Sequence, residues 1–392
     1  MNETLPMFAS CQPGLEPFLM AELESLGVAA DEVPGGATFA GDDELLLRVC
    51  LWLGTATHVR IRLARFRCRA LGELERKASE FRWGEWLNPR VPLVLHAASK
   101  RSRVYHTGAI RERIHNAVGR ALGEPPLLAK DGDEVTAPLH IRFVDDTCTV
   151  SLDATSTPLH RRGYRLDSRK APLREDLAYA LVLASGFEPG DALLDPFCGA
   201  GTIAIEAAAI ARCVPPGRLR PPPMQHSARF EPDTWQRLIA EIEPNEAVPQ
   251  IACSDRDEGA VTASLANAKR AGVADVLQIA HHAVTAQPWL EAGVAPARGV
   301  LVTNPPYGVR VKGKNPLLPL YQTLGHRMKK LGPTWRAAIL AHDVRLARRT
   351  SLPLEAAFTT KHGGLSVTAM TSATAQPAVG PQDRTATERR GG

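Results

Sequence analysis

Hydrophobic and polar positions in the first part of the chain alternate with periods of about two and about 3.6 residues, which are typical of short strands and amphipathic helices. One stretch is unusual because apolar residues alternate with arginines, with a single slip at Ala64. This pattern predicts a strand with a bulge and five arginines mostly on its polar side, either as solvated surface or in contact with phosphates. The expected elements are a strand at 8–10, a helix at 14–27, a Gly-rich hairpin at 33–40, a helix at 45–53 and the arginine strand at 59–69.

Farther along, apolar runs of strand length alternate with helical patterns, which is the order of an α/β sheet with helices on its faces. Pro172 is well placed to begin the first helix. The segment 214–235 is so rich in proline that an irregular surface excursion is expected there. The remaining expected elements are strands at 192–195, 251–254, 276–280, 299–303 and 336–342, helices at 173–185, after 202, at 260–271 and at 321–331, and a hairpin at 358–373 that turns at Gly363–Gly364.

The loop after the strand 192–195 carries the first chemical motif. Gly199 and Gly201 let a ligand lie against bare main chain at a helix N-terminus, where N–H groups are unpaired. The loop has neither the Lys-Ser or Lys-Thr of a Walker loop nor the third glycine of a dinucleotide fingerprint. Asp195 would repel a pyrophosphate but could hold an ammonium group or a ribose hydroxyl, so a cationic cofactor with a nucleoside fits better than a glycine turn that only packs a strand on a helix. The residues expected to bind it are Asp195, Pro196, Phe197, Cys198, Gly199, Gly201 and Thr202.

The second motif follows the strand 299–303 and reads Asn304-Pro305-Pro306-Tyr307. Two prolines stiffen the turn and remove two N–H donors, so the Asn304 side chain and the Pro305 carbonyl become fixed acceptors beside an aromatic ring. An exocyclic amine on a planar base needs two acceptors and a stacking surface, and Tyr307 can supply the surface. These four residues are the expected catalytic residues. A Pro-Pro turn that merely ends a buried strand is the plainer alternative.

An acid at the tip of the second strand of such a sheet can bridge the two hydroxyls of a ribose. Asp255 has that position, with Arg256 beside it, whereas Asp257 is better placed as a helix N-cap. The gap from Gly201 to Asp255 exceeds the usual ~20 residues, and the proline-rich segment accounts for the excess.

The two motifs resemble motifs I and IV of class I S-adenosylmethionine-dependent amino-methyltransferases. Their flanks, Leu159–Arg165 and Ala171–Ala178, are similar to those of bacterial THUMP-domain RNA methyltransferases that make N2-methylguanosine. The resemblance runs from Phe8 to about Ala373. It implies a Rossmann-like, seven-stranded class I methyltransferase domain, preceded by an α+β ferredoxin-like and THUMP RNA-binding region.

The resemblance also implies domains, a cofactor and a reaction. The domains would be a ferredoxin-like unit at 1–44, a THUMP-like domain at 45–155, the methyltransferase domain at 156–373 and a disordered tail at 374–392. S-adenosyl-L-methionine would be the cofactor, and the reaction would be methylation of guanosine N2 in RNA, with large-subunit ribosomal RNA favoured. Transfer RNA, adenine or cytosine amines of DNA, and a non-catalytic RNA-binding factor remain alternatives.

The sequence departs from the family after the third strand. The family usually has an acid there that accepts the adenine amine, but this chain has His281-His282-Ala283. A neutral ring nitrogen of His282, or of His281, could take that role.

A net charge of +5 is only mildly basic, so the distribution of charge is more informative than its sum. Basic residues gather around 100–103 and in the link before the methyltransferase domain, where RNA contact is favoured over a solvated linker. The candidates for RNA binding are Lys100, Arg101, Arg103, Arg161, Arg162 and Arg165.

Seven scattered cysteines with no Cys-x-x-Cys pair favour reduced thiols in a cytoplasmic protein over disulfides or a zinc site. There is no apolar run of membrane-spanning length and no basic and hydrophobic leader, so no membrane partner is expected. No metal is expected either, because the cysteines are scattered and two adjacent histidines alone do not make a metal site. The oligomeric state is not determined by the sequence, and a monomer is the simpler expectation.

Overall fold

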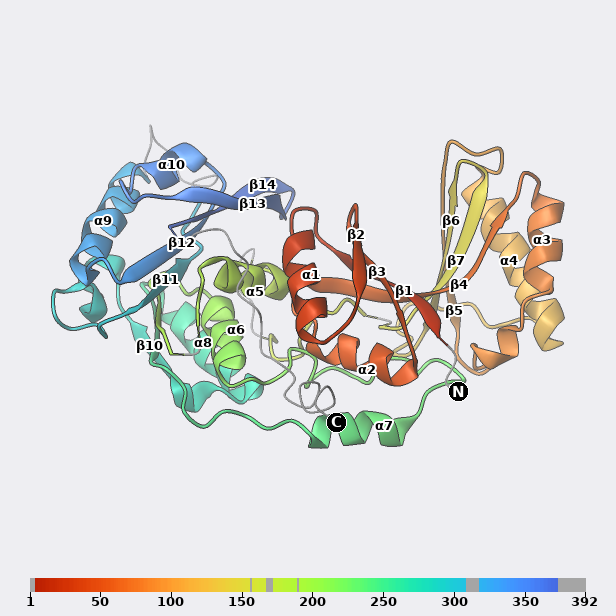
Figure 1. Cartoon of the computed structure of the whole chain (residues 1–392), viewed down its shortest axis with the longest axis horizontal. Helices are drawn as coiled ribbons and strands as arrows, with labels where there is room; N and C mark the ends of the chain where they lie inside the picture. Colours follow the sequence, from red (N-terminus) through yellow and green to blue (C-terminus); the bar gives the residue numbers. More distant parts are fainter. Residues whose placement is uncertain (1–3, 156, 167–171, 189, 308–316, 373–392) are drawn as a thin grey trace.

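A computed structural model describes residues 4–155, 157–166, 172–188, 190–307 and 317–372. They form two units that lie end to end along the longest axis of the molecule (Figure 1). We call residues 4–155 the N-terminal unit and residues 172–372 the C-terminal unit. Each is built on its own seven-stranded sheet.

The sheet of the N-terminal unit has the order β2-β3-β1-β4-β7-β6-β5, and its pairs are antiparallel except for β5 with β6. Strand β4 joins the first hairpin to the later strands, so one continuous sheet crosses the expected boundary at residue 44, and the division of the unit into two domains stays a prediction. The strands are β1 (Leu5–Cys11), β2 (Ala30–Val33), β3 (Gly36–Gly41), β4 (Ala56–Arg67), β5 (Leu93–Lys100), β6 (Ala137–Val144) and β7 (Thr147–Asp153).

Four α-helices pack on one face of this sheet because every second strand residue is apolar. Ile61, Ile141 and Val150 are buried on that face. The helix α2 begins with a cap in which the Asp42 carboxylate accepts from the Leu45 N–H. The helices are α1 (Glu16–Ser25), α2 (Asp43–Trp52), α3 (Leu71–Ser79) and α4 (Thr107–Leu122), with a short 3₁₀ turn η1 (Trp83–Glu85).

The sheet of the C-terminal unit has the order β10-β9-β8-β11-β12-β14-β13. Its first five strands are parallel neighbours, and β14 runs antiparallel to both β12 and β13. This confirms the expected seven-stranded, Rossmann-like sheet, and the turn between β13 and β14 falls at Gly363 and Gly364, both with positive φ. The strands are β8 (Ala192–Asp195), β9 (Ile251–Asp255), β10 (Leu277–His281), β11 (Gly299–Thr303), β12 (Trp335–Ala341), β13 (Glu355–His362) and β14 (Leu365–Thr371).

Successive residues of the central strands face two different cores. Leu193 and Val300 belong to the large core shared with α5 and α6, whereas Leu194 and Leu301 belong to the core formed with α9. The first helix begins at Glu175 with Arg174 as its N-cap, so the expectation that Pro172 starts the helix is wrong. The elements that cover the sheet are α5 (Glu175–Ala184), α6 (Thr202–Ala211), α8 (Glu258–Ala271), α9 (Leu318–Met328), α10 (Val344–Arg348) and the 3₁₀ turns η2 (Ala274–Val276), η3 (Val284–Ala286), η4 (Pro288–Leu290) and η5 (Lys329–Leu331).

The proline-rich segment 214–235 is irregular up to residue 231, as predicted, but it is not a surface excursion. Its last residues begin helix α7 (Pro232–Ala240), and Pro232 stands at a position where a missing N–H costs nothing. Its first part is buried against the N-terminal unit, where the Gly217 N–H donates to Leu51 O and the Met224 N–H donates to Ala154 O. The prolines therefore shape a strap that crosses from one unit to the other.

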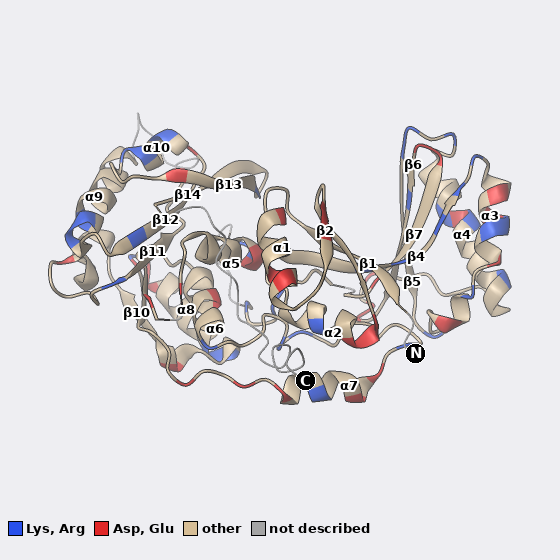
Figure 2. Ribbon diagram, in the orientation of Figure 1, with Lys and Arg blue, Asp and Glu red and all other residues tan. Residues whose placement is uncertain are grey.

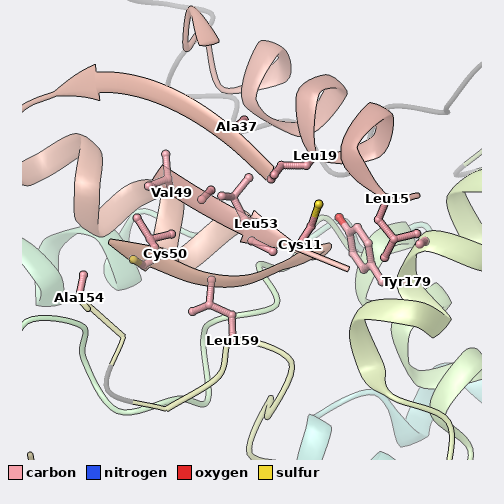
Figure 3. Packing of buried hydrophobic residues seen from close by; sticks show 14 of the residues in the cluster. Cys11, Leu15, Leu19, Ala37, Val49, Cys50, Leu53, Ala154, Leu159 and Tyr179 are labelled. Carbon is pink, nitrogen blue, oxygen red and sulfur yellow. The ribbon is translucent and has the colours of Figure 1, made fainter. Parts of the chain in front are cut away.

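The two units share one hydrophobic core at their junction. Tyr179 of α5 points toward Cys11 and Leu15 of the N-terminal unit (Figure 3). The tyrosine ring lies against the backbone at Gly54, where a Cβ atom would come within 2.4 Å of it. Glu22 of α1 accepts hydrogen bonds at this point from the N–H groups of Gly54 and Thr55. Close packing and satisfied backbone groups thus fix the units against each other.

A buried arginine completes the junction. Arg162 is 2% exposed and donates to Leu159 O at 2.8 Å and to Gly54 O at 2.6 Å, and it lies 3.5 Å from the carboxylate of Glu206 on α6. The Tyr164 hydroxyl donates to the other Glu206 oxygen at 2.8 Å. Burial lowers the pKa of Arg162, but the negative charges of Glu206 and neighbouring carboxylates more than offset this and leave it raised. The expectation that Arg162 binds RNA is therefore wrong, since its guanidinium is buried and engaged inside the protein.

We predict that Arg162→Met destabilises the chain by about 3–5 kcal/mol, because it leaves the Glu206 carboxylate buried without its cation. Urea unfolding followed by circular dichroism and by tryptophan fluorescence measures the change. Arg161→Met is the matched control, because Arg161 is the exposed neighbour and should change stability by less than about 0.5 kcal/mol. Equal stability of the two variants would contradict a structural role for the buried arginine.

Candidate active site

Three strand tips meet at the carboxyl edge of the C-terminal sheet and form the candidate site. β8 lies between β9 and β11, with Asp195 opposite Cys253 and Leu301 opposite Leu194. Because the strands are parallel, the loops after all three open at the same edge. The two sequence motifs, which are about 100 residues apart in the chain, are therefore neighbours in space.

Asp195 is the centre of this edge. Its Oδ1 accepts from the Thr303 hydroxyl at 2.7 Å and from the Phe197 N–H at 3.1 Å, so it ties the tip of β11 to the loop after β8. Its Oδ2 is buried and has no hydrogen-bond partner in the structure. Burial raises the pKa of the Asp195 carboxyl to about 7, and the charge of Asp255 adds to the rise, against the two hydrogen bonds, which lower it. A buried carboxylate oxygen without a partner is a place for a cation or a donor.

The glycine loop is held from behind by helix α8. The Ser264 hydroxyl donates to Gly199 O at 2.8 Å, and the Asn267 amide donates to Ala200 O at 3.0 Å. Gly199 and Gly201 both have positive φ, and a Cβ at Gly199 would meet nothing within 4 Å, which leaves the main chain bare on its outer side. Ser264 and Asn267 were not among the predicted site residues, although two polar residues three apart on an alanine-rich helix were a usable signal.

Asp255 closes the loop from the neighbouring strand. Its Oδ2 accepts from the Gly199 N–H and its Oδ1 from the Asp257 N–H, both at 3.0 Å. Asp257 caps α8 by accepting from the Gly259 N–H, as expected. Arg256 is exposed beside it. Since both Asp255 oxygens are already oriented by backbone donors, the carboxylate is fixed at the edge where a ribose would lie.

The two histidines after β10 lie next to Asp255. The Nε2 atom of His281 is 2.9 Å from Arg256 O, and the His282 N–H donates to Asp255 O at 3.1 Å. A further polar residue lies close by, because the buried Gln287 amide donates to Ser254 Oγ at 2.8 Å. The role of His282 in holding an adenine stays a prediction.

The Asn-Pro-Pro-Tyr turn follows directly from Thr303. The Tyr307 hydroxyl donates to Asn304 Oδ1 at 2.6 Å, and burial raises the pKa of Tyr307 well above its ordinary value, so the phenol keeps its proton. Tyr307 was predicted only to stack on the base. In the structure its hydroxyl also fixes the Asn304 amide. An amide oxygen has two lone pairs, so one remains for a substrate N–H. Pro305 is buried and Pro306 is exposed.

The residues expected to bind RNA divide into three groups. Lys100, Arg103 and Arg161 are exposed. Arg101 forms a two-point pair with Asp145 at 2.8 Å, and Arg165 pairs with Glu175 at 2.9 Å, so both are partly committed within the protein. Arg162 is the buried member described above. Exposure therefore supports three of the six candidates directly.

The residues present fit a cationic nucleoside cofactor. The partnerless Asp195 Oδ2 offers a negative charge, the open side of Gly199 offers bare main chain, and Asp255 lies at the neighbouring tip. Within the described residues, no group of three or more histidine, cysteine or acidic side chains is placed to hold a metal ion. Among the same residues, no helix combines the length and the apolar composition that a membrane span requires.

Comparisons with known proteins agree with this geometry. A family model described as the RMKL-like methyltransferase domain matches residues 162–370, and one described as the RlmL ferredoxin-like domain matches residues 6–60. Ribosomal RNA large subunit methyltransferase K/L of Syntrophotalea carbinolica is 32% identical over 93% of this chain and 53% of its own length. The enzyme of the same name from Legionella pneumophila is 32% identical over 93% of this chain and 52% of its own. The crystal structure of the methyltransferase SMU.472 complexed with SAH has a TM-score of 0.82 at 25% identity and covers 95% of this chain and 98% of that one.

The sheet order and the motifs at its edge define a class I, S-adenosylmethionine-dependent methyltransferase fold. The chain belongs to the RMKL-like methyltransferase family, since the family model covers more than half of it. It spans about half the length of the curated relatives that it matches. The expected family, fold class and cofactor are therefore confirmed, as is the ferredoxin-like start of the chain.

We predict that affinity for S-adenosylmethionine falls by up to about tenfold as the pH is lowered from 7.5 to 6.0. The pKa of Asp195 is raised to about 7, so the carboxyl is mostly ionised at the higher pH and mostly protonated at the lower one. Only the ionised form attracts an ammonium group, and an α-amino group with a pKa of about 7.7–8.0 is mostly protonated at pH 7.5 and almost fully protonated at pH 6.0, so its own titration is a smaller effect of opposite sign. Isothermal titration calorimetry at four pH values measures the effect.

Asp195→Asn is the control, and it should bind more weakly with no slope across the same range. The sign for stability is opposite. Because the folded-state pKa lies above that of an unfolded aspartate, this group stabilises the fold at low pH and loses that contribution as the pH rises through about 7. A wild-type affinity that is constant between pH 6.0 and 7.5 would mean that Asp195 does not meet the positive charge of the ligand.

Proposed function

We propose that this chain methylates the exocyclic N2 amine of a guanosine in RNA, using S-adenosylmethionine, and that large-subunit ribosomal RNA is its substrate. The observation that carries the proposal is the link from Asn304 through Thr303 to Asp195. It puts an amide acceptor and a carboxylate with a partnerless oxygen on adjacent strand tips. The names of the curated relatives, ribosomal RNA large subunit methyltransferases, support the ribosomal substrate.

The turn suits a nucleobase amine. Asn304 Oδ1 is held by the Tyr307 hydroxyl and keeps a second lone pair for one amine N–H, and the Pro305 carbonyl can accept the other. Both bonds draw the amine lone pair out of conjugation with the ring and free it for attack. S-adenosylmethionine supplies an electrophilic methyl group when it is bound. The methylated amine is acidic while it carries a positive charge, so it loses a proton to water without a dedicated base.

A base reaches such a turn only when it leaves its stack, which favours single-stranded or looped RNA. Residues 45–155 would serve as a THUMP-like RNA-binding module within this proposal. A cytoplasmic location belongs to it too, and the thiols support this because the described cysteines are all free. Transfer RNA and amines of DNA carry similar chemistry and are outcomes of the test.

The test is transfer of tritiated methyl groups from S-adenosylmethionine to protein-free large-subunit ribosomal RNA made by in vitro transcription. Digestion to nucleosides should yield labelled N2-methylguanosine. Transfer RNA and single-stranded DNA, each at the same nucleotide concentration, should take up little label. Preferential labelling of either would replace the proposed substrate, and cofactor binding without any labelled product would favour a non-catalytic factor.

We predict that Asn304→Ala lowers kcat by about 10²–10³ while S-adenosylmethionine affinity changes less than twofold, because it removes an acceptor that acts only on the amine. Tyr307→Phe keeps the ring and removes only the hydroxyl that fixes Asn304, so we expect kcat to fall about tenfold with KM for RNA unchanged. Single-turnover methyl transfer and calorimetry measure these quantities. Full activity of Tyr307→Phe would restrict the tyrosine to stacking.

A further inference from the structure

The second face of the N-terminal sheet carries no helix of its unit. Since Ile61, Ile141 and Val150 face the helices, the residues between them in each strand face the other way. Side chains on this second face are polar or charged along most of β4, β6 and β7. Such a surface is either solvated or has a partner.

The strand register gathers arginines on this face. Arg65 of β4 and Arg142 of β6 both pair with Thr149 of β7, one from each side, so the two guanidinium groups flank a single threonine. The shift in register between Arg62 and Ala64 keeps Arg62 on the same face as Arg65. Without that bulge Arg65 would point into the helix side. The expected bulge in the arginine strand is thus confirmed, and it serves to align positive charge.

Two further cations extend this surface. Arg67 pairs with Thr147, and Lys100 at the end of β5 pairs with Val144. We call Arg62, Arg65, Arg67, Arg142 and Lys100 the arginine face. Figure 2 shows basic positions along β4 and β6, at the end of the N-terminal unit away from the C-terminal unit. Arg65, Arg67, Arg142 and Lys100 are exposed, and Arg62 is half-buried with its guanidinium carbon 5.4 Å from the centre of the Phe8 ring.

Within the part of the chain that the structure describes, no ion pair joins Arg62, Arg65, Arg67 or Arg142 to a carboxylate, whereas Lys100 lies near Asp145 and helps to lower the pKa of that carboxyl. The neighbouring acids have other partners: Asp146 pairs with Arg69 at 3.0 Å, and the buried Asp153 pairs with His58 at 2.8 Å and with Arg60 at 3.4 Å. Burial lowers the pKa of Arg62, and the positive charges of Arg65 and Arg142 lower it further. Like charges held together on a rigid sheet repel each other, so the arrangement works against folding unless an anion offsets it.

We propose that the arginine face is a docking surface for the phosphate backbone of RNA, separate from the methyl-transfer site. Arginine suits this partner because its planar fork binds phosphate at two points and it is weakly hydrated. Arg65 and Arg67 lie about 7 Å apart along the strand, so both can follow one extended nucleic-acid strand. Phe8 under Arg62 adds an aromatic surface beside the charges. The identity of the polyanion as RNA rests on the proposed function.

The test compares RNA binding by the full chain and by the triple variant Arg62→Gln, Arg65→Gln, Arg142→Gln. The probe is protein-free large-subunit ribosomal RNA, and filter binding is measured from 50 to 300 mM KCl. We expect the triple variant to lose at least tenfold in affinity at 100 mM KCl. The slope of log Kd against log salt should fall by about 2–3, about one for each lost phosphate contact.

The matched control removes the same charge from exposed positions of the same unit, as Arg76→Gln, Arg82→Gln, Arg90→Gln. It should bind within twofold of wild type. The variant Arg62→Lys, Arg65→Lys, Arg142→Lys should keep the salt slope but not the full affinity. The melting temperature of the Gln triple variant should equal or exceed that of wild type, because like charges are removed, which separates lost binding from lost folding.

Several outcomes would overturn the proposal. The Gln triple variant could bind the RNA as the control does, or it could lose affinity for vesicles of phosphatidylserine and phosphatidylcholine while RNA binding is unchanged. Failure of the proposed function is distinguishable, because then neither wild type nor any variant transfers methyl groups to RNA. S-adenosylmethionine affinity should be the same in all four proteins, since none of the changed residues lies at the strand tips.

Discussion

The structure depends on one buried guanidinium between its two units. Arg162 donates to the backbone of Gly54 in the N-terminal unit and lies against Glu206 of α6 in the C-terminal unit. An ion pair without solvent is stabilising only where further hydrogen bonds satisfy it, and Leu159 O and the Tyr164 hydroxyl do this here. Since α6 begins at the glycine loop, the same helix that receives the arginine also carries the loop at its N-terminus. Helix α6 therefore connects the N-terminal unit to the candidate site, because it contacts the buried arginine through Glu206 and begins at the glycine loop.

At the carboxyl edge of the sheet, two carboxylates link neighbouring strand tips in a similar way. Asp195 receives Thr303 from one neighbouring strand, while Asp255 from the other neighbour receives Gly199 of the loop. These side chains tie three strand tips together. A substitution at one tip therefore changes the geometry of the other two, and binding and catalysis cannot be assigned to separate residues here.

Much of this was predictable from the sequence, because it rests on local patterns. The order of strands and helices, the bulge near Ala64 and the two strand-tip motifs follow from periodicity, glycine and proline. The prediction for Arg162 was wrong because the sequence of a basic run such as 160–165 is the same whether its arginines are solvated or buried. Only the contact with Glu206 in the folded chain identifies Arg162 as the buried one. The burial of the proline-rich segment was not predicted for a related reason. Prolines exclude a regular ladder but not burial, and at Pro232 a proline began a helix.

Two features of the chain oppose folding, and their positions are informative. The Asp195 carboxyl has an oxygen buried without a partner, and Arg62, Arg65 and Arg142 repel one another across β4 and β6. The first could be removed by a single substitution to Asn and the second by substitutions to Gln, and stabilising changes of this kind are easy to find in most proteins. The two features lie in different units, one at an edge where a cation fits and the other on a face where a polyanion fits. An unbalanced charge of this type is offset only when a ligand supplies the opposite charge. One methyl-transfer reaction accounts for both features, because its cofactor is a cation and its proposed RNA substrate is a polyanion.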